Sequence, residues 1–463
     1  MSKSLPLPIH SYEHLSRPVG VERLVNCFAE KAPPEGKAPS TLMRAPGIKS
    51  FITSFAASGR GLFNFKSRLY ALVGTNLWRI AADASMTFVG SVTGASIVSF
   101  APNPTQLVIC DPSASFIYDE SAATFQQILD ADFTSRAGAQ CCSVDGYILF
   151  REPNSGRFFS SNLNDALNYD ALNFATAEGS PDNIVGIITD HRQAVLAGEQ
   201  TMELWFNAGV PGFPFIRDLN GFLELGCAAG ASLAKADNSI YWLASDFTIR
   251  RLDGLTPVRV SQHGFEQAIQ TYATISDAYA FGYSQGGHIF YVLTFPTDGH
   301  TWVYDATTQE LHERQSYGLT RWRPCSSAFC YNKTFVQDFE TGNIGTLDLN
   351  TYTDFDNTQR MEFTFPSVYA DGERHYHNSL QLRAQTGVGT ATGQGANPQM
   401  TLEISNDGGR TFTTAATKSL GAIGQRKTTV YWDRLGYSDD RVYRGSISDP
   451  VKVVIADAQL DMG

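Results

Sequence analysis

Residues 68–80 read RLYALVGTNLWRI, two short apolar runs on either side of a turn. The first run, RLYALV, and the second, LWRI, contain the aromatic and aliphatic residues that favour β-strands. Gly74, Thr75 and Asn76 separate them, and glycine and asparagine are typical of tight turns. This stretch therefore predicts a β-hairpin.

The same pattern recurs along the chain at intervals of about 35–50 residues, which is the blade length of a β-propeller. Packing such sheets around an axis buries their faces and shortens their open edges. We expect a further strand on either side of each hairpin, as at residues 227–233 and 324–329. The sequence thus predicts about seven blades over residues 51–350. The other six hairpins are residues 106–110 with 115–119, 146–150 with 157–160, 193–197 with 201–206, 239–244 with 248–252, 288–294 with 301–305, and 333–337 with 343–347.

The segments on either side of this region have different sequence patterns. Residues 1–50 predict an extended arm, mobile or held by another surface, because prolines interrupt regular elements. Residues 351–463 predict an antiparallel β-sandwich with strands at residues 399–405, 442–446 and 451–455, and with the glycine-rich run 387–395 as a mobile hairpin tip. The best helix candidate is residues 264–271. The fold class is all-β. The arm's prolines are Pro6, Pro8, Pro18, Pro33, Pro34, Pro39 and Pro46.

Composition excludes several classes of protein. Of the 463 residues, 43% are hydrophobic, enough for a large core, and 17% are charged, below the usual ~25%. That deficit argues against coiled coils. The formal net charge of -11 makes wrapping of nucleic acid a poor hypothesis. With no long apolar run, we expect neither a secretion signal nor a membrane anchor.

The cysteines point to a protein made in a reducing cytoplasm. Their number is odd and most lie in apolar runs, so we expect buried, reduced thiols. Cys325 and Cys330 lack a second pair at zinc-site spacing, so no metal is expected there. The seven are Cys27, Cys110, Cys141, Cys142, Cys227, Cys325 and Cys330.

Three short motifs could carry chemistry, and each has a structural interpretation that we favour. Gly282–Gly286 matches G-x-S-x-G, but a nucleophile elbow needs a helix after it, and here strands lie on both sides. His375 and His377 could ligate metal from one strand face with Glu373, but an exposed strand is the better interpretation. The run from Gly387 to Gly389 lacks the helix of a phosphate loop.

Two further motifs also favour structural roles. Residues 405–412 (SNDGGRTF) fit the Asp-box pattern, in which the aspartate caps a hairpin turn. Arg314, Arg321 and Arg323 with Trp322 could touch phosphate or stack on a base. In an acidic chain we favour packing and ion pairs for this basic cluster.

Arg250 and Arg251 are neighbours on a strand, where successive side chains point to opposite faces, so they cannot form one patch. No paired-carboxylate or Ser/His/Asp arrangement is evident. We therefore expect no enzyme, no catalytic residues, no cofactor site and no metal site. The alternative is a glycan-binding or glycan-cleaving, sialidase-like propeller, although such an enzyme should repeat the Asp box on several blades.

Several segments together resemble a known family over nearly the whole chain. They include residues 182–205, 239–269 and 290–349, the tetrapeptide Val25-Asn26-Cys27-Phe28, and the turn Arg44 to Ile48. The chain resembles the packaged-DNA stabilisation protein of short-tailed bacteriophages, a tail hub or nozzle component.

The resemblance implies a structural protein of the virion tail, made in the host bacterial cytoplasm. It implies a homohexameric ring below the portal and its adaptor ring, which extends and closes the DNA channel and retains the packaged genome. The implied partners are the portal–adaptor ring, the tail needle or plug, tailspikes or fibres, and genomic DNA in passage. A receptor-binding tail tip is the remaining alternative.

Overall fold

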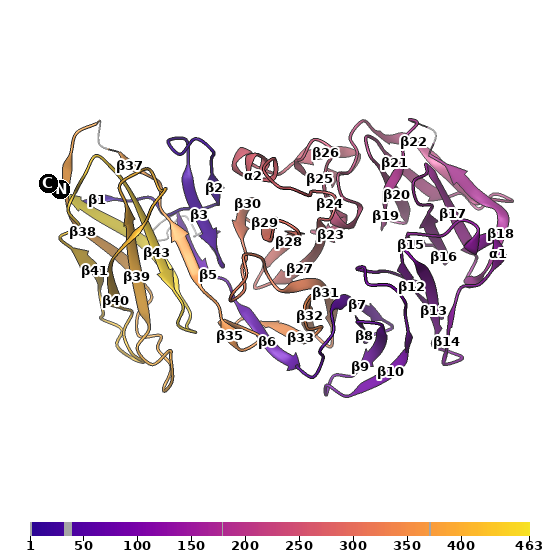
Figure 1. Ribbon diagram of the computed structural model, residues 1–463, viewed down its shortest axis with the longest axis horizontal. Coiled ribbons are helices and arrows are strands. Elements are labelled where there is room, and N and C mark those ends of the chain that lie inside the picture. Colours follow the sequence, from indigo (N-terminus) through magenta and orange to yellow (C-terminus); the bar gives the residue numbers. More distant parts are fainter. Residues whose placement is uncertain (1, 32–38, 178, 370–371) are drawn as a thin grey trace.

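The computed structural model describes residues 2–31, 39–177, 179–369 and 372–463. Figure 1 shows a long molecule with two parts, a ring of sheets and a separate sandwich that holds both chain termini. Helix is limited in the described residues to α1 (Ala131–Thr134), α2 (His263–Ile269) and one 3-10 turn (Gly230–Ser232). The expected short helix is thus confirmed, and the fold is all-β.

The ring is a β-propeller of seven antiparallel sheets. All seven hairpins expected from the sequence are present as the two middle strands of successive blades. Blades one to three are β7 (Gly59–Phe65), β8 (Arg68–Val73), β9 (Asn76–Ile80) and β10 (Met86–Ser91); β11 (Ser99–Pro102), β12 (Gln106–Asp111), β13 (Ala114–Asp119) and β14 (Thr124–Gln127); and β15 (Gln140–Val144), β16 (Tyr147–Arg151), β17 (Arg157–Asn162) and β18 (Asp165–Thr176).

The remaining four blades complete the circle. They are β19 (Ile184–Asp190), β20 (Gln193–Gly198), β21 (Met202–Asn207) and β22 (Phe215–Leu223); β23 (Ala234–Ala236), β24 (Ser239–Leu243), β25 (Ile249–Asp253) and β26 (Thr256–Arg259); β27 (Tyr279–Gln285), β28 (His288–Phe295), β29 (His300–Asp305) and β30 (Glu310–Glu313); and β31 (Pro324–Cys330), β32 (Lys333–Asp338), β33 (Ile344–Asp348) and β6 (Gly47–Ile52).

Buried side chains join each blade to the next. Tyr70 and Leu72 of blade one, for example, pack in one core with Leu107 and Ile109 of blade two. Equivalent cores follow around the ring, and the last one joins Phe335 of blade seven to blade one. The ring is closed because every sheet face is buried against a neighbour.

The N-terminal segment is held by other surfaces of the molecule, which is one of the two alternatives expected from the sequence. Its strands are β1 (Ser2–Ser4), β2 (Tyr12–Glu13), β3 (Val21–Val25), β4 (Cys27–Lys31), β5 (Ser40–Arg44) and β6. They pair with the sandwich, with the blade-six sheet and, through β6, with β33. The prolines of the described residues lie outside or at the ends of these strands, so the backbone between them is free to pair.

The C-terminal part is a sandwich around one core that includes Trp432, Leu380 and Tyr443. The expected strand at residues 399–405 is confirmed, and that at 442–446 lies within β43. The expected strand 451–455 is wrong in its start, since pairing begins only at Val454. The strands are β36 (Met361–Thr364), β37 (Val368–Tyr369), β38 (His375–Ala384), β39 (Gln399–Ser405), β40 (Thr413–Ser419), β41 (Val430–Asp433), β42 (Tyr437–Ser438), β43 (Asp440–Ile447) and β44 (Val454–Met462); β34 (Thr353–Asp354) and β35 (Asn357–Thr358) precede them.

The expected strand at residues 227–233 is also wrong. The 3-10 turn Gly230–Ser232 occupies this stretch, and the first strand of blade five, β23, starts only at Ala234. At Gly230 an added Cβ would lie 1.9 Å from the carbonyl oxygen of Val185. The small residues serve close approach to blade four and do not form a ladder of their own.

Candidate functional site: the junction of propeller and sandwich

The two parts of the molecule share one sheet. Strand β3 pairs in parallel with β30 of blade six, at Val25 and Glu313, and antiparallel with β36 of the sandwich, at Arg23 and Thr364. The hydrogen-bonded order continues from β36 to β43, β39 and β40, so that eleven strands are connected. In Figure 1, β3 lies between the sandwich and the propeller.

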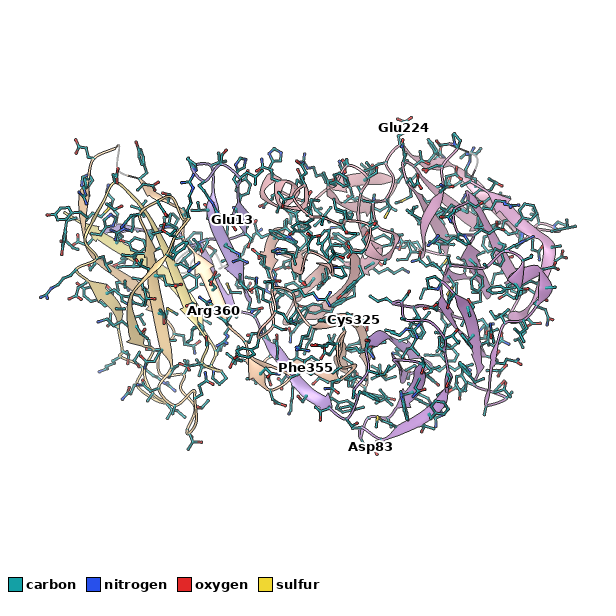
Figure 2. The ribbon with its side chains drawn as sticks, viewed as in Figure 1. Glu13, Asp83, Glu224, Cys325, Phe355 and Arg360 are labelled. Carbon is teal, nitrogen blue, oxygen red and sulfur yellow. The ribbon has the colours of Figure 1, made fainter. Side chains whose placement is uncertain are left out.

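Ion pairs follow this shared sheet from one part to the other. Arg23 donates to Glu313 through Nε (2.9 Å) and Nη2 (2.7 Å), a two-bond geometry that fixes direction as well as distance. The charge of Glu313 is the main cause that raises the pKa of Arg23 above its usual value. Arg360 and Arg444 approach Glu362 of the sandwich within 2.9 and 3.9 Å. Figure 2 shows Arg360 at this boundary.

Arg44, the first residue of the turn that carries the family resemblance, is buried at the junction. Its Nη1 donates to the carbonyl oxygen of Val451 at 3.1 Å and also to that of Asp449, while Nη2 donates to the carbonyl oxygen of Gln359. Burial is the main cause that lowers the pKa of Arg44 to about 10. One side chain thus connects β5, the linker before β36 and the loop before β44.

A second buried group lies on the propeller side of the junction. The Asp354 carboxylate accepts hydrogen bonds from Ser316 Oγ (3.0 Å) and Trp322 Nε1 (3.2 Å). Burial raises the pKa of Asp354. Arg314 donates to the carbonyl oxygen of Pro46 at 3.3 Å and lies 5.1 Å from the centre of the Trp322 ring. These contacts hold the Arg44–Ile48 turn against blades six and seven.

The basic cluster expected from the sequence is thus a packing and ion-pair site. Arg314 and Trp322 are both buried. Arg323 pairs with Asp338 and Glu340, each at 2.9 Å, and Arg321 stacks 3.5 Å from the ring centre of Phe339. Arg314 is thus buried in the junction, and the charge of Arg323 is already paired with two carboxylates.

Arg250 and Arg251 are likewise separate. Arg250 pairs with Asp246 at 2.6 Å and Arg251 with Asp237 at 3.1 Å. Their different partners agree with the alternation of side chains along β25.

A histidine joins the N-terminal segment to blade six. His288 Nδ1 lies 2.7 Å from Asp305 Oδ2, and Nε2 lies 2.6 Å from Glu30 Oε2 on β4. Chiefly through the bond to Asp305, the pKa of His288 is raised to about 8, although burial opposes this. Phe28 packs edge-on against the imidazole ring at 4.8 Å.

Ser284 of the G-x-S-x-G match lies within strand β27, and the turn to β28 follows at Gly286 and Gly287. The hairpin interpretation is therefore confirmed. Gly282 has a packing role, because an added Cβ would lie 2.1 Å from the carbonyl oxygen of Lys235. A nucleophile elbow is not formed.

The two candidate metal ligands have different surroundings. His377 is buried and its Nδ1 lies 2.7 Å from the Tyr443 hydroxyl, and burial lowers the pKa of His377 to about 4. His375 lies at the edge of the sandwich, 4.0 Å from Glu373. Across the described ranges no three His, Cys, Asp or Glu side chains are grouped so as to hold a metal ion.

The remaining motifs are structural. In the Asp box, the Asp407 carboxylate accepts from the backbone N–H of Arg410 (3.0 Å) and of Thr411 (2.9 Å), which caps the turn as expected. Arg444 stacks 3.8 Å from the ring centre of Phe412. The run from Gly387 to Gly395 connects β38 to β39 and precedes no helix. All seven cysteines are free and buried, as expected.

Exposed large apolar side chains occur in both parts of the molecule. At the propeller end, Leu172 on β18 and Leu219 on β22 are 77% and 86% exposed. At the sandwich end, Tyr369 and Tyr437 are 67% and 58% exposed. Figure 1 shows β18 and β22 in the part of the propeller far from the sandwich, and β37 in the sandwich.

Sequence reasoning missed the polar network of the junction. Residues of this network lie in Val25–Phe28 and Arg44–Ile48, two of the segments on which the family resemblance rests. Their role depends on partners up to 407 positions away in sequence, as with Arg44 and Val451. Spacing within a segment cannot reveal such partners.

Comparisons with known proteins agree with this architecture. A family model described as "Bacteriophage P22 Gp10, beta-propeller" matches residues 22–352, and one described as "Bacteriophage P22 Gp10, beta-sandwich" matches residues 360–463. No curated relative matches the chain. No helix in the described parts of the chain is long and apolar enough to cross a membrane.

Some solved structures are also similar. BamB of Moraxella catarrhalis is 13% identical, with a TM-score of 0.40 over 71% of this chain and 97% of that one. PorZ of Porphyromonas gingivalis is 9% identical, with a TM-score of 0.39 over 72% of this chain and 44% of that one. With TM-scores below 0.5, neither similarity bears on function. The two family matches do: the chain belongs to the bacteriophage P22 Gp10 family of structural phage tail proteins.

Proposed function

We propose that this protein is the tail-hub subunit of a short-tailed phage, made in the host cytoplasm and assembled as a homohexameric ring below the portal and its adaptor. The ring extends and closes the DNA channel and retains the packaged genome. It also anchors the tail needle or plug and the tailspikes or fibres. The protein acts by geometry, without catalysis, cofactor or metal.

The shared sheet is the observation that supports this proposal most. A ring subunit must keep its two contact faces at a fixed angle, because a small angular error in each copy prevents closure. The bidentate pair of Arg23 and Glu313 and the buried donors of Arg44 restrain that angle.

The net charge suits a conduit for DNA. With a formal charge of -11, the subunit has little capacity to bind phosphates by releasing counterions. We propose that lumen-facing residues are predominantly acidic or neutral, so that DNA slides without adhering. A continuous basic lumen in an electrostatic map of the assembled ring would contradict this.

Mass measurement of the purified chain, alone and mixed with a portal–adaptor complex, tests the hub role. We expect a complex of six copies of the 50.7 kDa chain, or about 300 kDa. We expect Tyr437→Glu at the sandwich end to weaken assembly. The control Leu255→Glu, in the turn between β25 and β26, should leave it intact. A chain that stays monomeric in both conditions would refute the proposal.

A further inference from the structure

The propeller encloses a cavity of about 830 Å³ on its axis. The first strand or turn of every blade contributes to its lining, from Phe63 of blade one through Gln140 of blade three to Cys325 of blade seven. Figure 2 labels Cys325 near the middle of the ring. The position on the axis means that no single blade supplies the site.

The charges of this cavity are unlike those of the whole protein. Among the residues that the structure describes, its lining contains two basic side chains, Arg151 and Lys235, and one carboxylate, Glu199. Glu199 already accepts a hydrogen bond from Asn183 Nδ2 at 3.2 Å. In a protein with a net charge of -11, basic side chains thus outnumber carboxylates among the described lining residues of this cavity.

Arg151 lacks a carboxylate partner among the described residues. Its Nη1 donates to the carbonyl oxygen of Ile184 at 3.3 Å, while its Nε is buried without a partner. Burial also lowers the pKa of Arg151. An anion with several oxygens in the cavity would supply the negative charge that this guanidinium lacks among the described residues.

Lys235 is the second basic side chain of the described lining. It lies on β23 of blade five, and within the described ranges it makes no ion pair. The positive charge of Lys235 acts to lower the pKa of the Cys142 thiol in blade three, but burial is the larger effect and raises that pKa to about 12. Lys235 and Arg151 line the same cavity.

We propose that the axial cavity binds a small phosphate-bearing anion between Arg151 and Lys235. The planar guanidinium suits phosphate oxygens, and lysine adds a point charge. The cavity volume lies in the range of small-molecule sites, about 300–1,000 Å³. A DNA duplex is too wide for it, so this site is separate from the proposed DNA channel.

Titration calorimetry of the purified full chain with inorganic tripolyphosphate, at constant ionic strength, tests the site. We expect saturable binding of one anion per chain, and binding at least tenfold weaker in Arg151→Gln and in Lys235→Gln. The control Arg192→Gln removes a cation that is exposed on a blade-four turn, and it should bind as the native chain does.

Thermal unfolding of each variant separates loss of the site from loss of the fold. Tripolyphosphate should raise the Tm of the native chain and of Arg192→Gln, but not of the two cavity variants. Absence of saturable binding to the native chain would overturn the proposal. So would equal binding in all variants, or displacement of tripolyphosphate by a single-stranded DNA oligonucleotide at lower concentration.

Discussion

Replacement of Arg44 by Met should loosen the junction without changing either domain's core. Arg44 donates to the carbonyl oxygens of Val451, Asp449 and Gln359, and its Nε lies 3.3 Å from Gln359 Oε1. Methionine keeps much of the side-chain length but supplies no donor. The substitution therefore leaves several buried acceptors without partners.

The size of the effect follows from those acceptors. A buried polar group without a partner costs about 1–3 kcal/mol. Removal of the buried cation offsets part of this, because burial disfavours the charged form, as the lowered pKa of Arg44 indicates. We expect a net loss of about 3–5 kcal/mol, comparable with breaking a buried charged contact.

Urea unfolding should measure this loss, and small-angle X-ray scattering should report the domain arrangement. In Arg44→Met we expect the midpoint to fall and the single transition to separate into two, because the propeller and the sandwich no longer unfold together. The distribution of interatomic distances from scattering should become broader, since the angle between the two parts is less restrained.

Arg68→Met is the matched control. Arg68 pairs with Glu120 at the surface and is 49% exposed, and such pairs contribute about 0–1 kcal/mol. If Arg44→Met cost no more than Arg68→Met, and the scattering curves were the same, the buried network would not be what fixes the junction.

Three further predictions concern other parts of the chain. The pKa of His288 in the folded state is raised to about 8. The stability that protonated His288 gives the fold should therefore be complete below about pH 6.5 and lost as pH rises through 8. In His288→Gln, the urea midpoints at pH 6 and pH 9 should differ less than in the native chain. Gly282→Ala should lower the free energy of unfolding by about 1–3 kcal/mol, and with it the Tm, because the added methyl group overpacks the site. Ser284→Ala, at an exposed position, should leave the Tm unchanged. Equal effects of the two substitutions on the Tm would contradict the packing role of Gly282. Asp407→Ala should lower the temperature at which the sandwich unfolds, measured by calorimetry, and an unchanged scan would show that the box does not cap its hairpin.

The hairpins of the propeller were predictable because their signals are local. In RLYALVGTNLWRI, strand-forming runs and a turn lie within 13 residues, and the pairing of β8 with β9 follows from that proximity. The Asp box and the hairpin around Gly286 were predictable for the same reason. The repeat spacing then indicated a ring, since a single blade cannot bury both of its faces.

The amino-acid sequence alone therefore determined the all-β class, the hairpins of the blades and the buried state of the cysteines. Only the tertiary structure decided how residues 2–31 and 39–52 pack, because β1, β3, β5 and β6 pair with strands about 290 to 460 positions away. It also decided that Arg314 and Trp322 pack at the junction and that Arg151 and Lys235 share an axial cavity. The physical reason is that burial, and with it the partner of each charge, is a property of the closed ring and not of any one segment.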